Sequence, residues 1–142
     1  MNEHFNSFLE ENTCASFACL DSQGHPYCFT CFYAVDLKEG LLYFKSSSDS
    51  NHAGYLKSNH FVAGTILPDK LNKLQVKGIQ FEGTVLEFDD ILTKSAGLQY
   101  YKTNPMAVAM AGEIWTVQLN RVKYTDSTLG FGKKIIWERA VN

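Results

Sequence analysis

The sequence lacks the features that mark several common classes of protein. No uninterrupted apolar run approaches the ~20 residues that a membrane-spanning helix needs. Thirteen lysines and arginines face 15 aspartates and glutamates, the formal net charge is −2, and no basic stripe suited to nucleic acid is present. Residues 1–4 contain an acid and no basic stretch, which argues against a signal peptide. These absences predict a cytoplasmic protein with no nucleic-acid or membrane partner.

Motifs of several enzyme classes are also missing. The chain has no G-x-S-x-G nucleophile elbow, no G-x-G-x-x-G and no Walker loop. His4, His25, His52 and His60 have none of the spacings of a metal-binding helix, so we predict no metal site. No acid–base pair or nucleophile stands out, and we assign no catalytic side chain. This is what a protein looks like when a bound cofactor brings the reactive atoms.

Four cysteines allow more than one interpretation. Cys28 and Cys31 form a C-x-x-C, a spacing used by zinc sites and redox pairs. They lie in a strand-like run over residues 27–33, where positions i and i+3 face opposite sides of a strand. Cys14 and Cys19 have the same difficulty because their separation is also odd. The pattern favours reduced, buried thiols that act as small apolar residues.

The chain is rich in strand signals. Its 142 residues, 45% of them hydrophobic, suit one domain over residues 1–142 with a core of its own. Alternation and turn residues predict strands near residues 13–20, 27–36, 41–44, 61–67, 79–86, 115–120 and 135–137. Caps and apolar spacing predict short helices after Asn2, from Asn51 to Lys57, from Asp89 or Asp90 to about Lys102, and after Asn104. The fold class is therefore mainly β, a six- to seven-stranded antiparallel barrel whose first three strands form a meander.

The most informative segment is Lys45-Ser46-Ser47-Ser48-Asp49-Ser50-Asn51-His52, between a predicted strand and a predicted helix. Free N–H groups at a helix start attract anions, hydroxyls add donors, and Lys45 and His52 can add positive charge, so a phosphate fits. The alternative is a serine-rich turn that only caps the helix, and Asp49 favours it by adding like charge. The run from Gly130 to Lys134 likewise suggests either an anion contact or a tight turn followed by solvated lysines.

Residues 27–59 resemble the cofactor-binding core of the pyridoxamine 5′-phosphate oxidase-like flavin split barrels. In that family a strand, a turn, a second strand and a Ser/Thr-bearing helix start follow in this order. The helix start usually reads aromatic-Thr-x-x-x-Ser-Arg-Lys. Two further segments closely resemble one poorly characterised bacterial branch, Gly78-Ile79-Gln80-Phe81-Glu82-Gly83 and Tyr124-Thr125-Asp126-Ser127-Thr128-Leu129-Gly130-Phe131-Gly132-Lys133-Lys134. The resemblance covers almost the whole chain and implies a flavin-reductase-like split barrel.

The same resemblance implies FMN, bound in clefts at the interface of a homodimer. The residues that would hold the FMN phosphate are Ser46, Ser50, Asn51 and His52, with Ser47 beside them. Residues 28–33 would line the ring and ribityl chain, Thr30 and Cys31 first. Gln80 is a further candidate because it shares a strand face with the position nearer Gly78 where the family carries a glutamine.

This chain departs from the family pattern at three places. Asn51 and His52 replace an Arg-Lys pair, and Cys28 replaces a basic residue, so the phosphate loses charge-assisted partners worth roughly 1.5–3 kcal/mol each. The Arg-x-His substrate segment is missing near residues 118–124, so we do not expect pyridoxamine phosphate as substrate. The preferred hypothesis is an FMN flavoprotein that transfers a hydride to or from a small molecule. The alternatives are a non-enzymatic flavin- or haem-binding module, and a structural protein that has lost the site.

Overall fold

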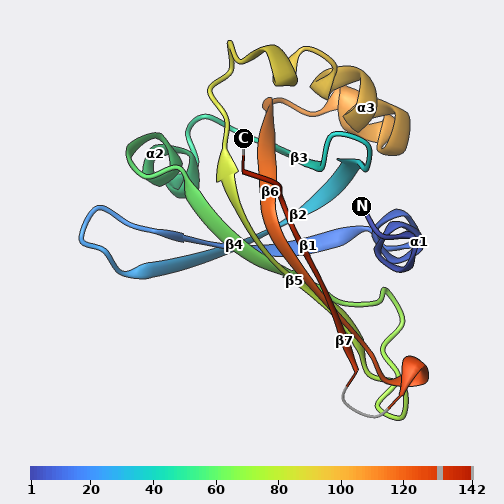
Figure 1. The fold of residues 1–142 in the computed structure, drawn as a ribbon. Coiled ribbons are helices and arrows are strands. Elements are labelled where there is room, and N and C mark those ends of the chain that lie inside the picture. Colours follow the sequence, from blue (N-terminus) through green and yellow to red (C-terminus); the bar gives the residue numbers. More distant parts are fainter. Residues whose placement is uncertain (131–132, 142) are drawn as a thin grey trace.

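The computed structural model describes residues 1–130 and 133–141. Seven strands form one antiparallel sheet in the order β3-β2-β1-β4-β5-β6-β7, and pairing of β3 with β6 closes six of them into a barrel (Figure 1). The strands are β1 (Cys14–Leu20), β2 (Pro26–Asp36), β3 (Leu41–Ser46), β4 (Phe61–Ile66), β5 (Lys77–Val85), β6 (Glu113–Asp126) and β7 (Lys134–Glu138). β7 pairs with β6 outside the closed barrel. The predicted fold class and the meander of the first three strands are confirmed.

Alternating side chains fill the barrel interior. In β5, Ile79 and Phe81 are buried whereas Gln80 and Glu82 are exposed, as a period of two requires. Phe81 packs edge-on against Phe17 with ring centroids 5.7 Å apart. These aromatic contacts across the barrel form the main core, so the outward-facing residues remain available for a site.

Short helices cover the ends of the barrel. They are α1 (Glu3–Glu11), α2 (Asn51–Ser58) and α3 (Ala96–Thr103), with 3-10 turns η1 (Ile91–Thr93), η2 (Pro105–Ala109) and η3 (Ser127–Leu129). The prediction of one continuous helix from Asp89 or Asp90 to Lys102 is wrong. Asp90 caps η1 instead, and the Thr93 hydroxyl donates to the carbonyls of Asp90 and Phe88. Side-chain bonds of this kind compete with the helix, which restarts only at α3. No helix within the described ranges is long and apolar enough to span a membrane.

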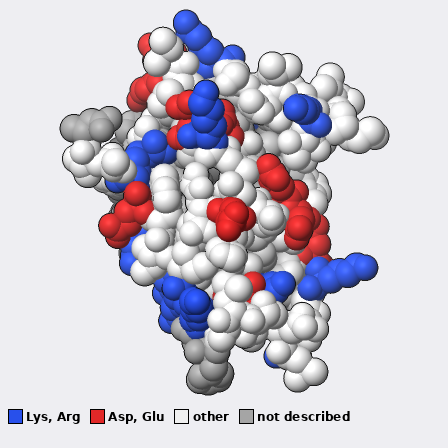
Figure 2. Space-filling view, turned by 45° about the vertical axis from the view of Figure 1, so that its right-hand side comes forward, with Lys and Arg blue, Asp and Glu red and all other residues white. Residues whose placement is uncertain are grey.

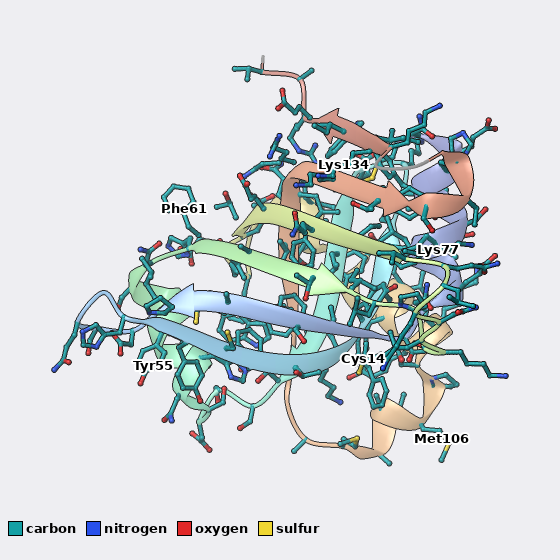
Figure 3. The ribbon with its side chains drawn as sticks, turned by 90° about the horizontal axis from the view of Figure 1, so that it is seen from below. Cys14, Tyr55, Phe61, Lys77, Met106 and Lys134 are labelled. Atoms are coloured by element: carbon teal, nitrogen blue, oxygen red, sulfur yellow. The ribbon has the colours of Figure 1, made fainter. Side chains whose placement is uncertain are left out.

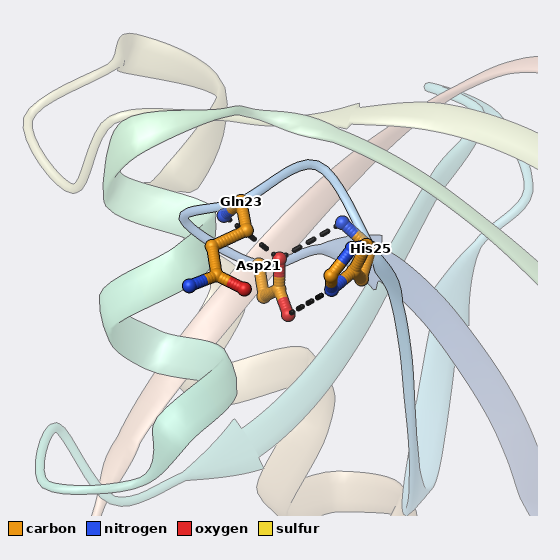
Figure 4. A network of polar contacts seen from close by, with 3 residues as sticks. All are labelled: Asp21, Gln23 and His25. Carbon is orange, nitrogen blue, oxygen red and sulfur yellow. Dashed lines mark hydrogen bonds and ion pairs between the residues drawn. The ribbon is translucent and has the colours of Figure 1, made fainter.

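The turn between β1 and β2 is organised by Asp21 (Figure 4). Its Oδ1 accepts hydrogen bonds from the N–H groups of His25 at 2.8 Å and Gln23 at 2.9 Å. The pKa of the Asp21 carboxyl lies below its usual value, chiefly because the carboxylate accepts the hydrogen bond from the His25 N–H. The turn fixes the register of the hairpin, in which Cys28 pairs with Ala18.

That register separates the cysteines. Cys28 is exposed on the outer face of β2, whereas Cys31 is half-buried and packs against the core, so the two point to opposite faces as strand geometry predicts. Cys19 is buried and Cys14 is half-buried. The expectation that the thiols are buried is wrong for Cys28, because its position in β2 faces outward. Within residues 1–130 and 133–141, no group of three or more His, Cys, Asp or Glu side chains could hold a metal ion.

Candidate functional site

The barrel wall opens between β2 and β3. Only Tyr33–Asp36 of β2 pair with β3, and the rest of β2 pairs with β1 alone. Tyr33 donates its N–H to the Thr13 carbonyl on the β1 side. Alternate residues of a strand turn their backbone groups to opposite edges, so Thr30 and Phe32 turn their N–H and C=O groups to the open side. This opening is where the two strands part, and a ligand can reach backbone groups there.

A groove of about 650 Å³ follows this opening. One wall consists of β2 and the end of β3, and the other consists of the end of α3 and residues 105–111. Four of the predicted site residues line it: Thr30, Cys31, Ser46 and Ser47. The volume lies within the range of small-molecule and cofactor sites.

Lys45 gives the groove its charge. Among the described residues that line the groove, Lys45 is the only charged one. Its Nζ donates to the carbonyl oxygens of Ala107 at 2.7 Å and Met110 at 2.5 Å, and to the Tyr101 hydroxyl at 2.9 Å. Elsewhere, on the face drawn in Figure 2, charges of both signs are scattered among uncharged residues. The groove therefore favours a ligand that is neutral or anionic.

Beside the groove, Ser46, Ser50 and His52 form a polar cluster. Ser46 Oγ lies 2.5 Å from His52 Nε2 and 3.2 Å from Ser50 Oγ, and Ser50 Oγ lies 3.2 Å from the same imidazole nitrogen. Ser50 is also the N-cap of α2, since its hydroxyl accepts the N–H of Ala53 at 3.4 Å. The capping role predicted as the alternative is confirmed, and the same hydroxyl takes part in the cluster.

The His52 ring is held by stacking. It lies parallel to the Phe29 ring, with centroids 3.8 Å apart and planes 6° apart. Burial lowers the pKa of His52 below its usual value. Burial therefore favours the neutral imidazole, which acts as a hydrogen-bonding group, whereas a lysine or arginine in its place would carry a permanent charge.

The other predicted residues lie at different distances from the groove. Asn51 is the exposed first residue of α2, directly next to the cluster. Gln80 is exposed on the outer face of β5 and lines a separate hollow of about 370 Å³ together with Cys28 and Lys123. Within one copy of the chain, the structure thus places seven of the predicted residues at or beside the groove and Gln80 apart from it.

Sequence reasoning missed the second wall of the groove. Tyr100, Asn104, Met106 and Met110 line it. Residues 104 and 105 predicted only a helix start, and the apolar run over residues 105–111 has no strand alternation to mark it. Of the other candidate anion contact, Lys134 begins β7, and Phe131 and Gly132 lie outside the described residues.

Comparison with known proteins identifies bacterial relatives, although no family model matches the chain. A UPF0306 protein of Photorhabdus laumondii subsp. laumondii is 36% identical over 121 residues, which cover 85% of each chain. A UPF0306 protein of Enterobacter sp. (strain 638) is 33% identical over 122 residues, 86% of each chain.

Three solved structures share the fold. One is a heme binding protein from Mycobacterium smegmatis, with a TM-score of 0.74 and 14% identity over 90% of this chain and 53% of that one. Another is a FAD-binding protein from Mesorhizobium loti, with a TM-score of 0.67 and 15% identity over 89% of this chain and 95% of that one. The third is an F420 reductase, with a TM-score of 0.63 and 21% identity over 86% of this chain and 98% of that one. These similarities show the split-barrel fold, and they do not show the finer expectation that the chain is pyridoxamine 5′-phosphate oxidase-like. The identity and coverage of its curated relatives show that the chain belongs to the UPF0306 family.

Proposed function

We propose that this chain is an FMN-binding flavoprotein that works as an oxidoreductase in a homodimer. The observation that carries the proposal is the groove itself, in which Lys45 is the only charged residue among the described lining residues and Ser46 joins the groove to the hydroxyl and imidazole cluster. A largely apolar groove that ends in hydrogen-bond donors, and whose described lining residues include no acid, suits a planar ring with a phosphate tail. The structural neighbours include a heme binding protein, a FAD-binding protein and an F420 reductase, which supports a planar cofactor in this fold.

The residues present fit the two ends of FMN. The hydroxyls of Ser46 and Ser50 and the His52 imidazole would hold the phosphate, with Ser47 and Asn51 beside them. Thr30 and Cys31 would face the ring, and the backbone groups that β2 turns to the opening would bond to its polar edge. Bound flavin supplies hydride transfer, and the protein orients the ring and limits access of water.

The outer face of the barrel supports the homodimer. Figure 3 shows β2, β1, β4 and β5 side by side, with Phe61 at one edge of this surface. The pairing registers align Thr30, Ser16, Thr65 and Gln80 in one row across these strands, and all four are exposed and uncharged. A second copy would pack on this surface, and Gln80 would then lie at the interface.

Titration with FMN and riboflavin, followed by flavin fluorescence, tests the phosphate end. In the double variant Ser46→Ala, Ser50→Ala we expect FMN to bind at least about tenfold more weakly, since a hydrogen bond to a charged group is worth roughly 1.5–3 kcal/mol and 1.4 kcal/mol is tenfold. Riboflavin, which lacks the phosphate, should bind as it does to the wild type. Ser58→Ala, at the far end of α2, is the matched control.

The outcomes of this titration separate the hypotheses. An equal loss of affinity for both flavins, or no loss for FMN, would mean that the phosphate does not bind at the cluster. A wild-type protein that takes up haemin and neither flavin would favour the haem-binding alternative, which the sulfur atoms of Cys31, Met106 and Met110 along the groove support. Bound FMN that neither NADH nor NADPH reduces would favour a binding module without enzyme activity.

A further inference from the structure

The segment over residues 105–111 forms one wall of the groove although little of it is buried. Met106 is 86% exposed, Val108 66% and Met110 67%, and among its described residues only Ala107 is buried. Such a segment has few core contacts to fix its position. Polar contacts must therefore hold it in place.

Three contacts do so, and Lys45 supplies the central one. At the start of the segment, Asn104 Nδ2 donates to the Tyr33 carbonyl at 3.2 Å. At its end, Gly112 adopts φ 136° against the Ser46 backbone, where an added Cβ would lie 3.1 Å from the Ser46 carbonyl. Between these points, the Lys45 ammonium donates to the carbonyls of Ala107 in η2 and of its C-cap Met110, and the Ala107 carbonyl also accepts the Met110 N–H that closes η2.

Lys45 also connects this wall to the polar cluster. It directly precedes Ser46 in β3, so one strand end positions the wall and the hydroxyls together. All three ammonium N–H groups have acceptors on residues 101–110. No acidic side chain among the described residues lining the groove neutralises the charge. The three N–H groups of the ammonium thus bond to the wall, and its positive charge would lie beside the ring end of a ligand.

We infer that Lys45 is a positioning residue, which holds residues 105–111 as the wall against which the planar ring of a neutral or anionic ligand packs. The flexible thioethers of Met106 and Met110 suit contact with a flat ring. The inference rests on the proposed function for the identity of the ligand. It adds a division of roles, because Lys45 serves the ring whereas Ser46 and Ser50 serve the phosphate.

The division of roles can be tested with the same two flavins. In Lys45→Met we expect FMN and riboflavin to bind about tenfold more weakly by the same factor, which corresponds to 1.4 kcal/mol of lost ring contact. Lys45→Arg keeps the charge and the donors and should restore most of the affinity. Lys102→Met, on the last turn of α3, is the control and should bind both flavins normally. A Lys45→Met protein that binds riboflavin as tightly as the wild type would overturn the inference.

Hydrogen exchange of the ligand-free protein keeps this test separate from the proposed function. We expect Lys45→Met to speed exchange at the amides of Ala107 and Met110, which are hydrogen-bonded within the segment, and to leave the barrel strands protected. Unchanged exchange there would overturn the inference even if flavin binds. If the wild type binds neither flavin, the proposed function fails, and haemin then serves as the planar probe in the same variants. Failure of all three probes to bind overturns both. If Lys45→Met does not fold, Lys45→Gln, which lacks the charge and keeps two N–H donors on a shorter side chain, replaces it.

Discussion

Gly64→Ala should destabilise the barrel strongly, because the position has no room for a methyl group. Gly64 lies in β4 between Phe17 of β1 and Phe81 of β5. A Cβ built there would lie 2.5 Å from the Ser16 carbonyl oxygen and would overlap the Phe81 ring. The carbonyl belongs to the backbone of a paired strand and the ring is 2% exposed, so neither can move away cheaply.

The magnitude follows from these two clashes. Overpacking a close-packed core costs typically 1–3 kcal/mol, and here it strains both the backbone and a ring, so we expect a loss of about 3 kcal/mol in the free energy of unfolding. A small domain has about 5–15 kcal/mol in total. The variant should therefore fold but unfold at a clearly lower urea concentration.

Urea unfolding followed by tryptophan fluorescence measures this loss. Gly54→Ala is the matched control, since a Cβ at Gly54 in α2 meets nothing within 4 Å. Alanine is favoured over glycine inside a helix by about 0.8–1.0 kcal/mol, so this control should be as stable as the wild type or more so. Combining Gly64→Ala with Phe81→Leu should cost less than the sum of the two changes, because the smaller side chain relieves part of the clash. A Gly64→Ala loss below about 1 kcal/mol would refute the reasoning, since it would mean that the ring does not cover Gly64.

Two further predictions concern titratable groups. Native protein treated with iodoacetamide should be modified first at the exposed Cys28. Burial raises the pKa of Cys31 to about 11 and that of Cys19 above its usual value, so these two thiols should react more slowly than Cys28. Mass spectrometry that finds Cys31 modified before Cys28 would contradict this. Burial alone would raise the pKa of Asp126, but hydrogen bonds from Thr128 and Tyr124 outweigh it and hold that pKa below its usual value. The contribution of Asp126 to stability is complete above the unfolded-state pKa of about 3.9 and is lost as pH falls through the lower folded-state pKa. Asp126→Asn should therefore reduce the dependence of the free energy of unfolding on pH below about pH 4. An unaltered acid profile in this variant would count against the prediction.

Much of the fold was predictable because local alternation records which residues face the core. The strand over β5 follows directly from this pattern. β6 was predicted only for residues 115–120, although it extends from Glu113 to Asp126. The register shift beside Gly83 falls opposite residues 119–121 of β6, so the alternation that marks the first part of the strand does not continue in phase beyond it. The pairing of β3 with β6 that closes the barrel joins residues 67 to 77 positions apart, and no local pattern specifies it.

The candidate site was likewise predictable only where its residues are close together in the sequence. The serine-rich cluster was predictable because Ser46, Ser50 and His52 lie within seven positions of one another. The opposite wall was not, because the bonds from Lys45 to Ala107 and Met110 span 62 and 65 positions. The sequence therefore suggested Lys45 as a cation for the phosphate, and the structure places its donors on the wall instead.

This placement has a consequence for how the groove would select its ligand. With Lys45 on the wall and the pKa of His52 lowered by burial, the phosphate end of the proposed ligand would rely on hydrogen bonds from hydroxyl groups and from the start of α2. The positive charge instead acts where the ring would lie. Selection by charge would then occur at the ring, and the preference for FMN over riboflavin would depend on the hydroxyls of Ser46 and Ser50. The two sets of variants should for this reason respond independently, and their effects on FMN affinity should add.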